Sequence, residues 1–291
     1  MNYKIFQPYY KKGQLETLDP EFTPYDNMAN ELPELREYHI FKSVIENGTV
    51  NDLDAWGFFS TRWKAKTRIK PTHFIDWIEK NPGMDVYLIN PGIIQESVTI
   101  NVWEQGEWYH PKMSQATEDV LKIMGIDVKL HTMLMTSDVY CFCSYFVGSK
   151  KFWTDYIEFL NKFVDSIELA DKETKRIIKS NANYGKDMSL NYFPFIIERL
   201  FPTYLCLYKS KYKTISFPYQ YQVYEKQIGN LTSLVQSLSL MKRSCAVLNN
   251  EKIFHTWMNG RGIFLEKYTH AFNYEEERYY DPKFELDTRR F

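Results

Sequence analysis

Runs typical of strands alternate with runs typical of helices through the first third of the chain, and this order constrains the fold more than any other feature. Aromatic and β-branched residues predict strands over 3–9, 55–60 and 85–90. Between them, helical spacing predicts helices over 35–46 and 72–80, each followed by residues that end helices. The order predicts an α/β fold, a sheet with helices packed on it. Ligands of such sheets bind beyond the carboxyl ends of the strands.

The rest of the chain continues with longer helical patterns. A strand is predicted over 138–147, and the Pro/Asp/Asn-rich run 18–27 is expected to be a loop. Helices are predicted over 114–124, 151–167, 171–186, 194–207 and 231–240, with 171–186 running into a mobile loop. We expect a catalytic domain over residues 1–214 and a C-terminal extension over 215–291 packed on it, or one single domain overall.

Composition narrows the class of protein. Aromatic residues make up 17% of the 291 residues, and such side chains fill cores but also stack on sugars and bases. The net charge of −1 neither demands nor excludes a polyanionic partner. Four cysteines without metal-ligand spacing suggest reduced thiols in a cytosolic protein. We expect no secretory signal and no transmembrane segment, because no apolar run is long enough.

Three short runs place charged or imidazole side chains in apolar, aromatic surroundings. They are residues 54–67, 101–111 and 193–201. Burial of such groups is costly unless a specific partner or a polar ligand meets them. We therefore expect the three runs to form three walls of one site.

The first run carries a set of cations at a strand end. Arg62, Lys64 and Lys66 leave the strand together with Ser60 and Thr67. Arginine pairs bidentately with phosphate oxygens and lysine adds a point charge, so this turn suits the diphosphate of a nucleotide-bound substrate. A solvated basic turn is the equally weighted alternative. The sequence has neither a P-loop nor a dinucleotide-binding motif.

The other two runs offer candidate acids and bases. Glu104, Glu107 and His110 lie among Trp and Tyr residues and could provide an acid, a base or metal ligands, or His110 could be a structural histidine. Glu198 could act as a general base whose pKa is set by Arg199, or the two could form a structural ion pair.

A divalent cation, Mn²⁺ or Mg²⁺, would neutralise a leaving diphosphate, and an acidic D-x-D at a strand end commonly binds it. The literal D-x-D of this sequence, Asp52-Leu53-Asp54, precedes its strand and so lies at the wrong end of the sheet. Asp85 and Asp138 are better placed but lack a second carboxylate. The sequence leaves metal use open.

Six segments follow one another in an order that is found in a known family. They are Tyr9-Tyr10, Gly57 to Arg62, Asp85 to Pro91, Trp103 to His110, Cys141 to Trp153 and Glu198 to Leu200. This order resembles that of bacterial GT-A type glycosyltransferases of capsule and lipopolysaccharide clusters. The resemblance is remote, covers about residues 3–207, and departs from the pattern at Cys141, where the strand has cysteines but no Asn.

The resemblance implies a GT-A-like, Rossmann-like mixed sheet flanked by helices, with a C-terminal helical or irregular extension. It implies a hexosyl- or pentosyltransferase that moves a sugar from a nucleotide-sugar donor to a hydroxyl of a surface glycan or a lipid-linked glycan precursor. The implied catalytic residues are Glu104, His110 and Glu198. The implied donor-binding residues are Gln7, Tyr9, Asp26, Asn27, Ser60, Arg62, Lys66, Thr67, Asp85 and Arg199.

Two alternatives compete with this function. A phage-type enzyme could glycosylate hydroxymethylated bases in DNA, because the run 207–214 and the cluster Lys172, Lys175, Arg176 and Lys179 are basic. A non-catalytic carbohydrate-binding or assembly protein would use the aromatics for stacking alone. We expect the protein in the cytoplasm or at the inner membrane surface, or in the host cytoplasm if phage-encoded.

Overall fold

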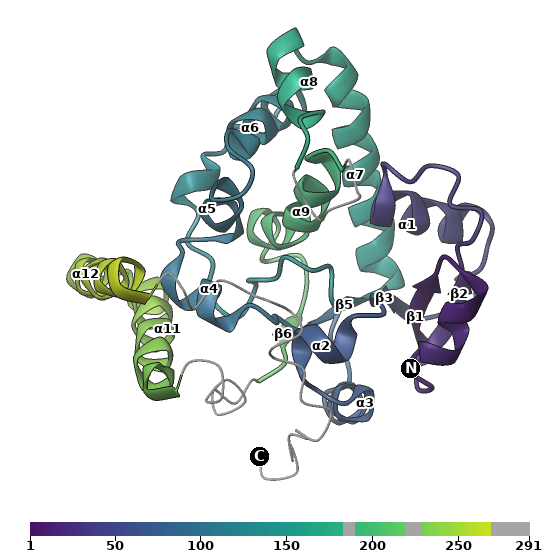
Figure 1. Ribbon diagram of the computed structural model, residues 1–291, viewed down its shortest axis with the longest axis horizontal. Helices are drawn as coiled ribbons and strands as arrows, with labels where there is room; N and C mark the ends of the chain where they lie inside the picture. Colours follow the sequence, from purple (N-terminus) through teal and green to yellow (C-terminus); the bar gives the residue numbers. More distant parts are fainter. Residues whose placement is uncertain (183–189, 219–228, 269–291) are drawn as a thin grey trace.

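A six-stranded mixed sheet forms the centre of the computed structural model, which describes residues 1–182, 190–218 and 229–268 (Figure 1). The strand order is β2-β1-β3-β5-β4-β6. The strands are β1 (Tyr3–Tyr9), β2 (Thr23–Asp26), β3 (Ala55–Phe58), β4 (Val86–Leu88), β5 (Phe146–Ser149) and β6 (Thr214–Ser216). β5 runs antiparallel to both of its neighbours, and the other strands share one direction.

Helices cover both faces of the sheet (Figure 1). One face carries α1 (Arg36–Glu46), α5 (Val102–Glu107), α6 (Met113–Ile123), α7 (Lys150–Leu169), α8 (Lys172–Ile178) and α9 (Phe193–Leu207). The other carries α2 (Trp63–Thr67), α3 (Pro71–Lys80), α4 (Ile93–Val98), α11 (Thr232–Leu248) and α12 (Glu251–Tyr268). Short 3-10 turns are η1 (Lys12–Thr17), η2 (Leu130–Thr132) and η4 (Gly229–Leu231). The expected α/β class, a mixed sheet flanked by helices, is confirmed.

Each face of the sheet buries its own hydrophobic core, because successive side chains of a strand point to opposite faces. Trp56 and Phe58 of β3 enter the core under α7 and α9, while Ala55 and Phe59 enter the core over α3 and α4. In the first core the rings of Phe146 and Phe201 stack with centroids 3.8 Å apart. The high aromatic content therefore serves the cores to a large extent.

Two sequence predictions about strands are wrong. The strand predicted over 138–147 begins only at Phe146, because the amides of Val139 and Tyr140 both donate to the carbonyl of Thr136 in a turn. Ser144 then has a positive φ of 52° that breaks an extended run. The expected loop 18–27 contains β2, whose Pro24 is tolerated because β2 lies at the edge of the sheet.

For several helices the sequence predicts the helical segment but not the residue at which it ends. The helix expected over 171–186 ends at Ile178, and part of that range lies outside the described residues. The helix expected over 231–240 extends to Leu248. Helix α12 is not predicted, since Gly260 and Gly262 lower its helix propensity. Gly260 allows α12 to approach α11 closely, because a Cβ there would lie 2.9 Å from a methyl group of Leu238.

Helices α11 and α12, here called the C-terminal hairpin, pack on α4. Val235, Leu238 and Trp257 of the hairpin belong to the same core as Ile94 and Val98 of α4. The described part of the expected extension thus shares a core with the sheet, and a domain boundary at residue 214 stays a prediction. None of the described helices has the length and apolar character needed to span a bilayer.

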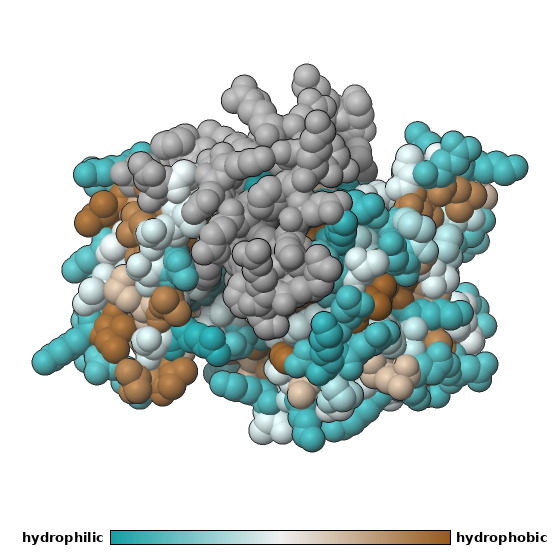
Figure 2. Space-filling model, turned by 90° about the horizontal axis from the view of Figure 1, so that it is seen from below, coloured by the Kyte–Doolittle hydropathy of each residue, from teal (hydrophilic) through white to brown (hydrophobic). Residues whose placement is uncertain are grey.

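The outer side of the C-terminal hairpin exposes apolar side chains. Leu240, Val247, Leu248 and Ile263 are each more than half exposed. Figure 2 shows brown groups on the left, on the side where Figure 1 places these helices. The hairpin therefore buries one side and leaves an apolar surface on the other.

The close approach of β3 to β5 requires glycine at position 57. A Cβ at Gly57 would lie 2.2 Å from the carbonyl oxygen of Phe146. We expect Gly57→Ala to lower the free energy of unfolding by about 3 kcal/mol or more, because the strands must separate. Urea denaturation measures the change. Gly13→Ala, which meets no atom within 4 Å, is the control, and equal losses in the two variants would contradict the prediction.

Candidate functional site

The carboxyl ends of the parallel strands meet at one edge of the sheet, together with the segment that enters β5. Tyr9 ends β1, Asp26 ends β2, and Ser60 follows β3. Because β5 is antiparallel, Cys143 and Tyr145 precede it at this same edge. Topology alone thus gathers five residues, three of the predicted site and two of its neighbourhood.

Gln7 braces two loops of this edge. Its side chain is fully buried, its amide nitrogen donates to the carbonyl of Ser60 at 3.0 Å, and its amide oxygen accepts from the backbone of Asp19 at 2.7 Å. Lys64 then pairs with the buried Asp19 carboxylate at 2.6 Å. Gln7 and Lys64 therefore hold the loops after β1 and β3 in fixed positions.

Lys66 lies over the entrance to β5. Its ammonium nitrogen is 3.8 Å from the sulfur of Cys143 and 6.0 Å from the ring centre of Tyr145. The Tyr145 hydroxyl is 2.6 Å from that of Ser60, whose oxygen accepts from the backbone of Arg62 at 3.3 Å. Burial raises the pKa of Cys143 to about 11, so its thiol is protonated at neutral pH.

Glu198 of α9 faces this cluster from the other side. Burial raises the pKa of its carboxyl to about 8, and the nearby Glu37 carboxylate raises it further, whereas Lys66, Arg199 and Arg36 oppose the shift. The side chain keeps partial contact with solvent, and its carboxylate accepts no hydrogen bond from the described residues. A half-buried carboxyl that titrates near neutral pH is suited to proton transfer.

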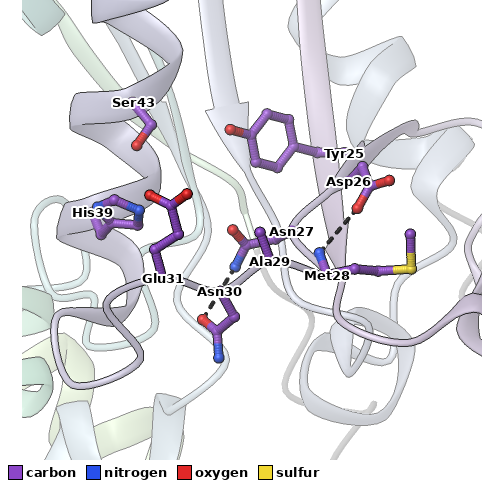
Figure 3. A pocket seen from close by; sticks show the side chains of 9 residues that line it. All are labelled: Tyr25, Asp26, Asn27, Met28, Ala29, Asn30, Glu31, His39 and Ser43. Atoms are coloured by element: carbon purple, nitrogen blue, oxygen red, sulfur yellow. Dashed lines mark hydrogen bonds between the residues drawn. The ribbon is translucent and has the colours of Figure 1, made fainter.

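A polar hollow of about 430 Å³ lies beside the cluster, between the end of β2 and α1 (Figure 3). Asp26 and Asn27 line it from β2, and His39 and Ser43 line it from α1. Tyr10 connects the hollow to the cluster, because its hydroxyl is in hydrogen-bonding contact with both Asn27 and Arg36. The Tyr10 hydroxyl thus links Asn27 of the hollow to Arg36, which lies close enough to Glu198 to influence its pKa.

Besides Gln7, three predicted donor-binding residues lie elsewhere or have structural partners. Asp85 precedes β4 at the opposite edge, where its carboxylate accepts from the amide of Lys213 and the hydroxyl of Ser149. Thr67 is buried and donates to the carbonyl of Trp63. Arg199 is buried and donates to Gln105 and to the carbonyls of Val102 and Phe195, which fastens α5 to α9.

Glu104 and His110 are not brought together with Glu198. Glu104 accepts from the backbone of Ile100 and pairs with Arg261 of α12. His110 is buried against the rings of Tyr192 and Phe195, and burial, with Arg199, lowers its pKa to about 4. The runs 101–111 and 193–201 are thus joined through Arg199 and Phe195, while Glu104 is engaged by α12. That the three runs form three walls of one site stays a prediction.

The sequence did not single out Tyr10, Cys143 and Tyr145 as site residues. All three positions stand in segments that carry the family resemblance, Tyr9-Tyr10 and Cys141 to Trp153. What was missing was the direction of β5. A strand predicted to begin at residue 138 places Tyr145 in its interior, whereas the observed β5 starts beside it.

A second buried charge cluster binds the C-terminal hairpin to α4. Lys242 of α11 and Glu96 of α4 are both fully buried, with nitrogen and carboxylate oxygen 3.5 Å apart. The Lys242 ammonium also donates to the carbonyl of Glu96 at 2.6 Å and lies 5.1 Å from the ring centre of Tyr140. Burial lowers the pKa of Lys242 to about 8, while Glu96 opposes the shift.

No group of three or more His, Cys, Asp or Glu side chains within residues 1–182, 190–218 and 229–268 is arranged to hold a metal ion. The Lys66 ammonium lies at this edge, and Arg62 stands at the N-cap of α2, the helix that carries Lys66.

Comparison with known proteins gives one distant similarity. No protein-family model and no curated protein matches the sequence. Among solved structures, the apo structure of the bifunctional glycosyltransferase WbbM is similar, with 17% sequence identity and a TM-score of 0.47. The match covers 76% of this chain and 45% of the WbbM chain, so this chain spans less than half of that protein's length.

The raised pKa of Glu198 predicts a pH-dependent stability. The folded protein holds this proton up to a pH of about 8, whereas the unfolded chain releases it near 4.5, so stability falls as the pH rises between these values. We expect Glu198→Gln to be more stable than the wild type, by an amount that grows across this interval at no more than about 1.4 kcal/mol per pH unit. Urea denaturation at several pH values, with the exposed Glu79→Gln as control, measures it. A constant difference between Glu198→Gln and wild type would contradict the prediction.

Removal of one partner from the Lys242 and Glu96 pair should be costly. We expect Lys242→Met to lower the free energy of unfolding by about 3–5 kcal/mol, because Glu96 is left buried without its cation. The double variant Lys242→Met with Glu96→Gln should regain part of this loss, since no unpaired charge remains. Urea denaturation of the two variants tests both statements, and additive losses would count against them.

Proposed function

We propose that this chain is a glycosyltransferase that moves a sugar from a nucleotide-sugar donor to a hydroxyl acceptor. The observation that carries the proposal is that the Lys66 ammonium, which lies beside Cys143 at the entrance to β5, is close enough to the titratable carboxyl of Glu198 to lower its pKa. A transferase of this kind needs a base for the acceptor and positive charge for the departing diphosphate. The edge supplies both within one site.

The chemistry assigns a role to each side chain. The Glu198 carboxylate takes the proton of the acceptor hydroxyl, and the acceptor oxygen forms a bond to the anomeric carbon. The bond from that carbon to the diphosphate oxygen breaks, and its electron pair leaves with the diphosphate. Lys66 and Arg62 stabilise the negative charge that develops there. The hollow lined by Asp26 and Asn27 receives the nucleoside of the donor.

A glycan or a lipid-linked glycan precursor is the proposed acceptor class. The DNA alternative loses support because several of its basic residues are paired with acids. Lys175 pairs with Glu168, Arg176 with Glu173, and Lys211 with Asp155. Such pairs reduce the positive charge that could meet a phosphate backbone.

The proposed function predicts nucleotide release from at least one donor in a panel of UDP-, GDP-, CMP- and dTDP-sugars. We expect Glu198→Gln to lower kcat by about 10²–10⁴-fold, because a positioned general base contributes that much. The wild-type kcat should rise as the pH passes about 8, since the carboxylate form is the base, and this rise should vanish in Glu198→Gln.

Glu79→Gln, an exposed carboxyl on α3, serves as the control and should behave as the wild type. A protein that neither binds nor cleaves any of these donors would instead fit the non-catalytic carbohydrate-binding alternative. Unchanged turnover in Glu198→Gln would remove that residue from the reaction and leave the base unassigned.

A further inference from the structure

The edge of the sheet that carries the proposed site offers cations where a metal-using transferase would need carboxylates. The resemblance to GT-A type enzymes implies a divalent cation held by a D-x-D. The literal motif lies at the opposite edge. The carboxylate of Asp54 accepts from the backbone of Asn2, ahead of β1 and β3, and the carbonyl of Asp52 accepts from the Asn2 side chain.

On the side of the sheet that carries the proposed site, the carboxylates of Asp19 and Asp26 already have partners. Asp19 is buried in an ion pair with Lys64 at 2.6 Å and lies beside the Gln7 amide. Asp26 accepts from the backbone of Met28 at 2.9 Å and from the hydroxyl of Tyr9. Asp19 would have to give up its ion pair with Lys64 to bind a divalent cation, and the hydrogen bonds of Asp26 occupy part of its carboxylate.

Glu31 lines the hollow and Glu37 lies near Glu198, but among the described residues no three His, Cys, Asp or Glu side chains are arranged to hold a metal ion. Glu198 itself has a cationic environment. Lys66, Arg36 and Arg199 all lie close enough to influence its titration. A divalent ion placed beside the Lys66 ammonium would be repelled, whereas a diphosphate in the same place would be attracted. The residues present therefore do not fit the implied metal, but they suit the diphosphate whose charge such a metal would neutralise.

We propose that the ammonium of Lys66 and the guanidinium of Arg62, in place of a divalent cation, neutralise the diphosphate of the donor. This inference rests on the proposed function. Arg62 and Lys66 lie on the same short turn of chain as the Ser60 to Tyr145 hydrogen bond, which ties that turn to the entrance of β5. Arginine can pair with two phosphate oxygens, and lysine adds one more charge.

Calorimetric binding of UDP, GDP and dTDP to the full chain tests the inference. One of these diphosphates is expected to bind with equal affinity in EDTA and in Mn²⁺ or Mg²⁺. Lys66→Met and Arg62→Met should each weaken its binding by about tenfold or more, because each removes a charge-assisted contact. Lys66→Arg should retain most of the affinity, and the affinity of the wild type should fall as salt is added.

Lys80→Met is the matched control, because Lys80 is exposed at the end of α3, away from the site. Thermal unfolding of each variant shows whether it is folded, and Arg62→Met serves if Lys66→Met is not. Binding that requires the divalent cation, or that is unchanged in both charge-removing variants, overturns the inference while leaving a transferase intact. If no diphosphate binds under any condition and no donor is cleaved, the proposed function falls as well.

Discussion

The pairing of β3 with the antiparallel β5 is the constraint on which the rest of the structure depends. It joins the β2-β1-β3 half of the sheet to the β4-β6 half, and it passes through Gly57, where the backbone of Phe146 leaves no room for a side chain. The same pairing brings the start of β5 to the carboxyl ends of the other strands. Tyr145 and Cys143 meet Ser60 and Lys66 for this reason.

Buried charged side chains occur in two regions of the molecule, and they have different roles in each. In the cluster of Glu96, Lys242, Glu104 and Arg261, nearly every charge has a partner of opposite sign, and the result is a joint between helices. Around Glu198 the neighbouring charges are of both signs: besides burial, Glu37 raises the pKa of its carboxyl, whereas Lys66, Arg199 and Arg36 lower it, and the side chain keeps contact with solvent. A carboxyl in such surroundings exchanges protons readily, whereas one in a closed ion pair does not.

The sequence predicted the parts of the site that follow from parallel strands. Tyr9 ends a predicted strand, Ser60 and Lys66 stand at or beyond the end of another, and strands of one direction end at one edge. Asp26 came only from the family resemblance, because its segment was expected to be a loop. The sequence did not predict which helices pack against the short helix α5 and the residues after it. Glu104 pairs with α12, a helix that was not predicted because its two glycines lower its helix propensity. His110 packs on α9. Asp85 was misplaced because it begins its strand and so lies at the other edge.

The ion pair between Glu96 and Lys242 joins positions 146 residues apart in the chain. During synthesis, α4 emerges from the ribosome long before α11 exists. Until Lys242 arrives, α4 must either stay open to water or bury a carboxylate without its cation, and the second state is costly. The hairpin therefore closes the fold late, and a chain that stops short of it holds one face of its sheet unsealed.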